Sequence, residues 1–201
     1  MALFRQPFRA PFRTSRSGVQ VNLDEQERDI LVQLLGQLDD LLDDGEPASE
    51  AEQDPLAALV GMPDPEAEPP GTPEDPAVAR LLPDGSRDDD EASAEYRRLT
   101  EHGLRARKRT GARMAAQALS RDEPVVLTQE EALALMKALT DVRLVLGERL
   151  ELRTDEDAEL LHERLWSGDG SESFLATASV YELLTSWQDH LVQAVSSGRK
   201  R

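Results

Sequence analysis

The spacing of hydrophobic residues predicts helices along most of this 201-residue chain. Apolar side chains recur every three or four positions, the spacing that places them on one face of a helix. The clearest stripe runs from Leu135 to Leu150. It follows TQEE (Thr128–Glu131), a capping box in which two side chains satisfy free backbone N–H groups. The predicted helices span about 23–43, 76–82, 91–120, 129–150, 155–166 and 174–196.

Short polar motifs predict where the first two helices begin. Asn22, with Glu25 three residues later, is the expected cap of the first, and Asp75-Pro76 that of the second. The third helix contains Gly103 and Gly111, each of which costs about 1 kcal/mol relative to Ala. These two glycines predict either a break in that helix or a face that another helix approaches closely.

Alternation of apolar and polar residues predicts two short strands. Residues 19–23 (VQVNL) place Val and Leu on one face, and residues 125–127 (VVL) form a second apolar run. We therefore expect a mainly α fold: a helical bundle of five or six helices with a small two-stranded β element.

The negative charge of the chain is gathered in one segment. The chain carries a net −17, and between Asp39 and Glu91 18 acidic residues face two arginines, so this span holds −16 of the total. Eight of the twelve prolines fall between Pro47 and Pro76. Such a segment has too little apolar surface to offset the entropy of ordering it, so we expect a disordered linker over residues 43–74.

The rest of the chain is nearly neutral and long enough for one stable domain. No apolar run approaches the roughly 20 residues that span a bilayer, and no secretory signal is recognisable, so we expect a cytoplasmic protein. The expected organisation is a disordered basic Phe-Arg arm (1–18), the strand and first helix of the core (19–42), the acidic Pro-rich linker (43–74), the main helical domain (75–196) and a basic tail (197–201).

The basic arm contains Phe-Arg three times, with prolines between the copies and no acidic residue through position 18. Such an arm could insert into a DNA minor groove, stack on exposed bases, lie on an anionic membrane, fold back on the acidic linker, or stay a disordered tail. Four arginines are few for membrane attachment at about 1 kcal/mol each, so we expect no membrane partner. The candidate contact residues of the arm are Arg5, Phe8, Arg9, Phe12 and Arg13.

A second cationic segment lies in the third predicted helix, where seven basic residues face one acid, Glu101. Arg98, Arg105 and Arg109 share a stripe that could contact phosphates, grip an acidic protein, bind the chain's own linker, or simply face solvent. If the linker approaches this stripe, deleting Gly45–Thr72 should tighten DNA binding at low salt. No helix-turn-helix spacing supports base-specific recognition. The candidate DNA- or partner-binding residues are Arg97, Arg98, Arg105, Arg107, Lys108, Arg109 and Arg113.

Further candidates for partner contact or for the core are Arg143, Arg149 and Trp187. The two arginines have acidic neighbours that could pair with them at the edge of the domain: Asp141, Glu148 and Glu151. Trp187 shares an apolar helix face with its neighbours, which favours the core, although a surface tryptophan can also anchor a partner.

No motif in the sequence points to catalysis. Cysteine is absent, and the three histidines, His102, His162 and His190, lie far apart. Disulfides, thiolate nucleophiles and zinc–thiolate sites are therefore excluded, and we expect no metal and no cofactor. The chain also lacks a glycine-rich phosphate loop, a nucleophile elbow and an HExxH motif. We expect a protein that binds partners rather than an enzyme, either a regulator or a helical adaptor or scaffold.

Four segments resemble an actinobacterial family of oxidative-stress regulators, the AosR-like family, which was first described as a domain of unknown function. The resemblance covers 19–42 and 75–195 and rests on the order and spacing of the segments. They are DPAVARLLPD (Asp75–Asp84), EYRRLTEHGLRARK (Glu95–Lys108), LTDVRLVLGERL (Leu139–Leu150) and LLTSWQDHL (Leu183–Leu191).

The resemblance implies a regulatory protein that acts in transcription by protein–protein contact with a stress-type sigma factor or RNA polymerase, with DNA contact as a further option. It also implies a cysteine pair as the redox sensor. Here the chain departs from the family pattern, since a sequence without cysteine cannot form a disulfide switch. The Phe-Arg repeat is not part of the resemblance, and the sequence leaves the particular partner and the oligomeric state open.

Overall fold

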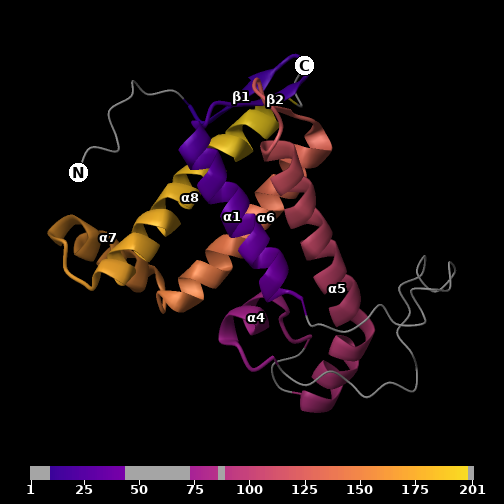
Figure 1. The fold of residues 1–201 in the computed structure, drawn as a ribbon. Coiled ribbons are helices and arrows are strands. Elements are labelled where there is room, and N and C mark those ends of the chain that lie inside the picture. Colours follow the sequence, from indigo (N-terminus) through magenta and orange to yellow (C-terminus); the bar gives the residue numbers. More distant parts are fainter. Residues whose placement is uncertain (1–9, 44–72, 86–88, 199–201) are drawn as a thin grey trace, which may run out of the picture.

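A computed structural model describes residues 10–43, 73–85 and 89–198 of the chain. The expected mainly α class is confirmed, because these residues form six helices and a small antiparallel sheet (Figure 1). Of the predicted acidic linker, only Asp43, Pro73 and Glu74 belong to the described part. Residues 1–9 of the arm and 199–201 of the tail lie outside it as well.

The sheet has three strands rather than two. β1 (Phe12–Ser15) pairs with β2 (Gly18–Val21), and β2 pairs with β3 (Val126–Leu127); both pairs are antiparallel. The turn from β1 into β2 requires glycine at position 18, where φ is +143°. A Cβ on Gly18 would stand 2.0 Å from the carbonyl oxygen of Leu127.

The prediction of a disordered arm over residues 1–18 is wrong for its second half, because β1 belongs to the fold. Only 2% of the Phe12 surface is exposed. The hydroxyl of Thr14 donates a 2.7 Å hydrogen bond to the carbonyl of Ala194, which ties β1 to the last helix. Phe12 and Thr14 share one face of the strand and Arg13 the other, as the two-residue period of a strand requires.

α1 (Glu25–Leu41) begins at Asp24 rather than at Asn22. The Asp24 carboxylate accepts from the backbone N–H of Glu27, and the Glu27 carboxylate accepts from the N–H of Asp24. Asn22 is engaged elsewhere, since its side-chain amide donates to the carbonyl of Ala10. Both Asn22 and Asp24 have a glutamate three residues later, so the capping motif alone fits either position.

α4 (Pro76–Leu81) begins at the predicted Asp75-Pro76 cap. α5 (Asp90–Leu119) is one helix of 30 residues that continues through both glycines. A Cβ on Gly111 would meet nothing within 4 Å, and one on Gly103 would meet only the Arg107 side chain at 3.5 Å. The glycines therefore mark neither a break nor a close helix contact, and both predicted alternatives are wrong.

The last three helices are α6 (Gln129–Arg149), α7 (Asp155–Ser167) and α8 (Glu172–Gly198). The predicted capping box at the start of α6 is confirmed. α7 ends at Gly168, whose φ of 69° is the left-handed conformation that favours glycine at a helix end. α8 then runs from α7 to the sheet (Figure 1).

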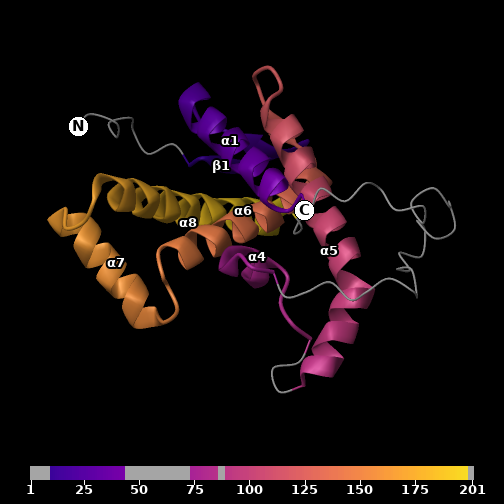
Figure 2. The same ribbon diagram turned by 60° about the horizontal axis from the view of Figure 1, so that its bottom comes forward.

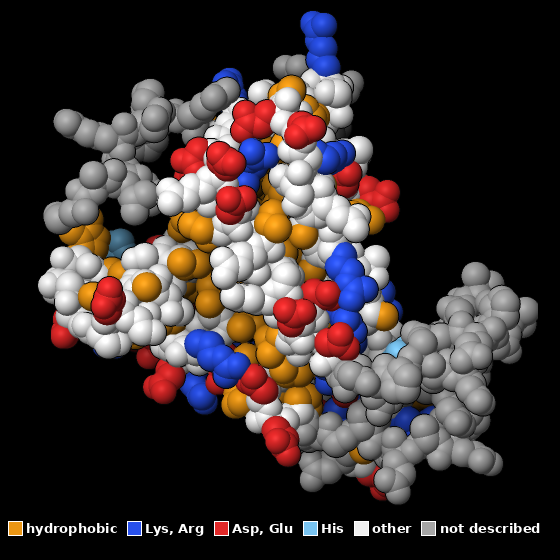
Figure 3. Space-filling model, viewed as in Figure 1, with side chains coloured by type: hydrophobic (Ala, Val, Ile, Leu, Met, Phe, Trp, Pro, Cys, Tyr) orange, Lys and Arg blue, Asp and Glu red, His pale blue; other side chains and the backbone are white. Residues whose placement is uncertain are grey.

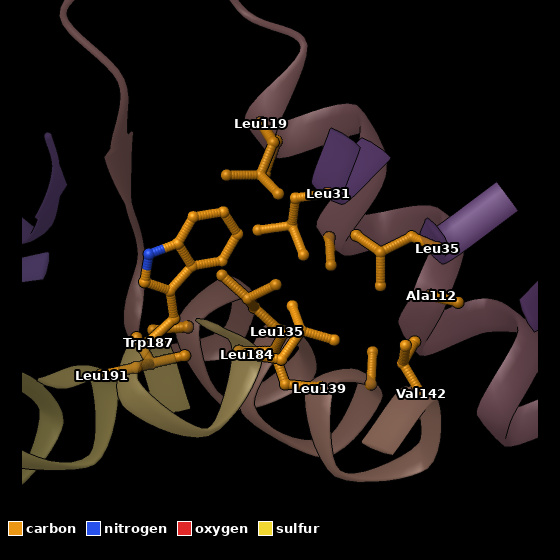
Figure 4. Close-up of a cluster of buried hydrophobic side chains, with 14 of the residues drawn as sticks. Leu31, Leu35, Ala112, Leu119, Leu135, Leu139, Val142, Leu184, Trp187 and Leu191 are labelled. Atoms are coloured by element: carbon orange, nitrogen blue, oxygen red, sulfur yellow. The ribbon is translucent and has the colours of Figure 1, made fainter. Parts of the chain in front are cut away.

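The core lies where α1, α5, α6 and α8 meet (Figure 4). Leu31 and Leu35 of α1 face Leu135 and Leu139 of α6, and all four side chains are fully buried. Burial of one such leucine contributes about 1.5–3 kcal/mol. Trp187 of α8 packs in the same cluster with 3% of its surface exposed. Trp187 therefore belongs to the core.

α7 lies apart from this core, at the edge of the molecule beside α8 (Figures 1 and 2). Its inner side contributes Leu161 and Leu165 to a small second cluster that includes Leu150 and Ala178. Its outer side faces solvent.

Candidate partner-binding surfaces

The cationic segment of α5 is largely neutralised within the chain. Six of its seven basic residues form ion pairs with carboxylates of the same chain, most of them from other elements. Figure 3 shows the result, with Lys or Arg side chains next to Asp or Glu side chains along this face. The pairs are Arg97–Asp84, Arg98–Glu95, Arg105–Glu101, Lys108–Asp141, Arg109 with Asp39 and Asp43, and Arg113–Asp39.

Two arginines join α5 to the end of α1. Arg109 donates to Asp39 at 2.9 Å and to Asp43 at 2.7 and 2.9 Å, and Arg113 donates to the second oxygen of Asp39 at 2.8 Å. Hydrogen bonding to Asp39, and then to Asp43, raises the pKa of Arg109. Asp43 is the first residue of the predicted linker, so contact between this helix and the chain's own acids is observed at that point.

The centre of α5 holds two pairs that are shielded from water. Lys108 donates to Asp141 of α6 at 2.5 Å, and Arg105 donates to Glu101 on the same helix at 2.7 and 2.9 Å. Asp141 and Glu101 are each only 6% exposed. Because a buried carboxylate needs a partner, these cations serve the packing of α5 and are not available to phosphates.

At the start of α5, Arg97 pairs with Asp84, and Arg98 pairs with Glu95 one turn away. Arg107 is the exception: it is exposed, and no carboxylate of the described residues pairs with it. The predicted phosphate-binding stripe of Arg98, Arg105 and Arg109 is therefore committed to internal ion pairs.

The two arginines of α6 have partners other than those predicted. Arg149 donates to Asp75, the cap of α4, at 2.5 Å, and this hydrogen bond is the main reason that the pKa of Asp75 is lowered. Arg143 donates to Gln188 of α8 at 2.7 Å, and its guanidinium lies 5.3 Å from the ring centre of Tyr181. Both arginines join α6 to a neighbouring helix, so they are structural.

The candidate contacts of the arm separate into three groups. Arg5, Phe8 and Arg9 lie outside the described residues, and Phe12 is buried against α8. Arg13 is exposed on the outer face of β1.

The outer side of α7 carries the most exposed large apolar side chain of the described residues, Trp166, at 82%. Its indole N–H donates to Nε2 of His162 one turn earlier at 2.9 Å, and the two rings meet edge to face. Glu159 and Glu163 stand on the same helical stripe and are exposed. Leu160, 54% exposed, lies on a neighbouring stripe.

This α7 face, which we define as Glu159, His162, Glu163 and Trp166, was missed by sequence reasoning. The helix has five acids and one basic residue, Arg164, whose guanidinium lies over the ring of Phe174 at 3.8 Å. The sequence feature that could have predicted this face is a tryptophan inside an acidic amphipathic segment. A tryptophan held by a hydrogen bond and bordered by carboxylates can receive an Arg or Lys side chain of a partner.

The described residues give no sign of a metal centre or a membrane span. No three or more His, Asp or Glu side chains in this part of the chain lie together in a way that could hold a metal ion. None of the helices described is long and apolar enough to cross a bilayer. Beside the start of α1 there is an open depression lined by Asp24, Glu25, Gln26 and Asp29.

Fold and surfaces together define a mainly α domain whose longest helix, α5, is held by internal ion pairs. The chain belongs to the family described as "Domain of unknown function (DUF2017)", whose model matches residues 9–195. It is 31% identical over 187 residues to the oxidative stress regulator AosR of Mycobacterium bovis and of Mycobacterium tuberculosis. The match covers 86% of this chain and 80% of that protein. No solved structure matches the chain.

Proposed function

We propose that this chain is a regulatory protein of the oxidative-stress response that acts by binding another protein, and that a stress-type sigma factor or RNA polymerase is that partner. The regulatory role is supported by the similarity to AosR, which is named an oxidative stress regulator. The choice of partner follows the resemblance drawn from the sequence. The proposal assigns the protein no catalytic activity and places it in the cytoplasm, where transcription occurs.

The single observation that carries the binding mode is the exposure of Trp166. Burial of a tryptophan ring stabilises a folded chain, so a ring that is 82% exposed on a helix edge gains most when a partner covers it. Tryptophan is also among the residues that dominate protein–protein binding energies. α7 lies outside the main core, so a partner can cover its outer side without disturbing the bundle.

The charge around Trp166 defines the kind of segment that fits. Glu159 and Glu163 border the ring, and α7 as a whole carries five acids against one arginine. A basic segment would match this charge and could place an Arg or Lys side chain on the indole face. We therefore propose that the partner contributes a basic surface or helix to the α7 face.

Sensing is the step at which this chain must differ from a thiol-based regulator. With no cysteine it forms no disulfide, so an oxidant signal would reach it through the partner. This absence also favours the second candidate function, a helical adaptor that joins proteins without sensing oxidants itself.

The proposal is tested with purified full-length chain, core RNA polymerase and stress-type sigma factors from the same organism, in a co-elution assay. We expect a complex with the polymerase or a sigma factor. The double variant Trp166→Ala/Leu160→Ala should lower the affinity of this complex at least tenfold. The control is Ile30→Ala/Val192→Ala, which removes two exposed apolar side chains elsewhere (38% and 42% exposed) and should bind as wild type. Failure of both transcription proteins to bind contradicts the proposed regulator and leaves the adaptor. Binding that survives the Trp166 variant contradicts the α7 face alone.

A further inference from the structure

The side of α5 that faces away from the bundle carries a regular line of apolar and small residues. α5 packs against α1 and α6, with Ala112, Ala115 and Leu119 buried on the packed side. At 3.6 residues per turn, another set of α5 residues falls on the opposite side, at alternating intervals of four and three positions. These residues, which we define as the α5 seam, are Ala92, Tyr96, Leu99, Gly103, Ala106 and Thr110.

The α5 seam exposes two large apolar side chains. Tyr96 is 46% exposed and Leu99 is 49% exposed. The Tyr96 ring is supported on one side, because a Cβ on Gly85 would stand 2.5 Å from its Cγ atom. Figures 1 and 2 show that the first half of α5 extends past the ends of α1 and α6. The described residues therefore leave an apolar helix face without a helix packed on it.

The spacing of the α5 seam favours a second helix as its occupant. Alternating steps of four and three give an average repeat of 3.5 residues, the repeat with which two helices pack side by side in a coiled coil. A helix that only covers the core of a globular domain shows a wider apolar stripe. The seam is narrow, and it lies on the side of α5 that the core does not use.

Gly103 has no packing role within the described chain. Only a side-chain nitrogen of Arg107, at 3.5 Å, lies near the place where its Cβ would be. Glycine inside a helix costs about 1 kcal/mol relative to alanine, and no close contact in the same chain offsets this cost. A glycine on an exposed helix face provides room for the side chain of another molecule.

The sizes of the seam residues match those of a second copy that runs antiparallel. In one antiparallel register, Leu99 lies opposite Gly103 of the second copy. The same register places Tyr96 opposite Ala106, so that each large side chain meets a small residue on both sides of the two-fold axis. A parallel pair would place Tyr96 against Tyr96 and Gly103 against Gly103, which crowds one end and leaves a gap at the other.

The charges along α5 favour the same direction. Residues 89–95 contain four acids and no base, whereas residues 96–113 contain seven bases and one acid. Antiparallel packing lays the acidic start of each helix beside the basic part of the other. Arg107, which is exposed and has no ion-pair partner among the described residues, comes level with Glu95 of the second copy in the register above.

We propose that two copies of this chain associate through the α5 seam as an antiparallel, two-fold symmetric pair of helices. A contact between single helices is small for a protein interface, so we expect a reversible dimer with a Kd of about 10–100 µM. α7 lies across the molecule from α5 (Figures 1 and 2), so the α7 face stays accessible in this dimer. The association does not depend on the proposed function and is tested without another protein.

Sedimentation velocity of the full-length chain, from about 1 to 300 µM at about 0.15 M salt, measures the association. Wild type should show a monomer–dimer equilibrium. Tyr96→Ser/Leu99→Ser should raise the Kd at least tenfold, because it removes the two large apolar side chains of the seam. The matched control is Ile30→Ser/Val192→Ser, which removes two exposed apolar side chains from α1 and α8 and should change the Kd less than threefold.

A second pair of variants separates the dimer contact from the stability of the helix. Gly103→Gln and Gly111→Gln both replace a helical glycine by a better helix former, so both should raise the melting temperature. Only Gly103→Gln should raise the Kd at least tenfold, because its side chain fills the space that Leu99 of the second copy would occupy. Gly111 lies off the seam, and a Cβ there would meet nothing within 4 Å.

The absence of cysteine permits a direct test of direction. In the proposed register Ala92 lies opposite Thr110, so a mixture of Ala92→Cys and Thr110→Cys should form a disulfide between the two variants under mild oxidation. Each variant alone should link poorly, since like positions are separated by about 27 Å along the pair. The proposal is overturned by a chain that stays monomeric throughout, by a dimer that neither seam variant weakens, or by efficient linking within each single variant.

Discussion

Lys108 of α5 donates a 2.5 Å hydrogen bond to Asp141 of α6, whose carboxylate is almost completely buried. The pair joins two long neighbouring helices of the bundle. It shows how a cationic segment can have a structural role. Its basic side chains form ion pairs with acids that tertiary folding brings from distant parts of the chain, so they are not available to the phosphates of a ligand.

Replacement of Lys108 by Met should destabilise the protein by about 3 kcal/mol, since it leaves the Asp141 carboxylate buried without its cation. Chemical denaturation monitored by circular dichroism measures this loss. The double variant Lys108→Met/Asp141→Leu should recover most of it, because removing both charges removes the desolvation cost as well. Equal losses in the single and double variants would contradict the account of this pair.

Phe12→Ala should destabilise the protein by about 3–4 kcal/mol, the usual cost of emptying the site of a buried phenylalanine. This prediction depends on β1 belonging to the core, where Phe12 is 2% exposed. Removal of residues 1–9 serves as the control and should leave the free energy of unfolding unchanged within about 0.5 kcal/mol. If Phe12→Ala proved as harmless as that truncation, β1 would not be part of the stable fold.

Stability should fall as the pH drops below about 5. The pKa of Asp75 is lowered from its ordinary 3.8, chiefly by Arg149. The pKa of Glu131 is lowered from 4.5, since hydrogen bonds from Thr128 and Arg121 outweigh the opposing effect of burial. A carboxyl group with a lowered folded-state pKa stabilises the fold above its unfolded-state pKa, and this contribution is lost as the pH falls through the folded-state value.

Urea denaturation at about pH 7, 5, 4 and 3.5 measures this dependence. Glu131→Gln should be less stable than wild type at neutral pH and should lose less stability on acidification, because one of the titrating groups is gone. A variant that lost as much as wild type over this range would show that Glu131 does not contribute.

The helices and their caps could be predicted from the sequence because they follow from local patterns. TQEE and Asp75-Pro76 sit at the starts of α6 and α4, and the apolar stripe of α8 placed Trp187 in the core. β1 was not predicted because the prolines and arginines of residues 1–18 do not give the apolar–polar alternation typical of a strand. The strand is stabilised instead by pairing with β2 and by contact with α8. The choice of Asp24 over Asn22 as a cap likewise depended on a tertiary contact, the hydrogen bond from Asn22 to Ala10.

The candidate site was harder to predict than the fold. A count of charges along the chain predicts a strong positive face on α5, but Asp39 and Asp141, which neutralise it, are distant in sequence. The exposure of Trp166 depends on which side of α7 packs against the rest of the protein, and the spacing of apolar residues does not specify that side.

A thiol oxidant should have no direct effect on this chain. Diamide treatment followed by removal of the reagent should leave its melting temperature and its complex with a reduced partner unchanged, because there is no cysteine to oxidise. Diamide treatment of the partner instead should change the affinity of the complex. A complex that weakens after treatment of this chain alone would require a sensing group other than a thiol.

The central claim, that a transcription protein binds over Trp166, is tested most directly by ¹⁹F NMR of the chain labelled with 5-fluorotryptophan. Its two tryptophans give two signals, which Trp166→Phe assigns. Addition of unlabelled sigma factor or RNA polymerase should shift or broaden the Trp166 signal, while a sigma factor should leave the position of the buried Trp187 signal unchanged. A complex that forms with the Trp166 signal unaltered, or the absence of any complex, would contradict the account.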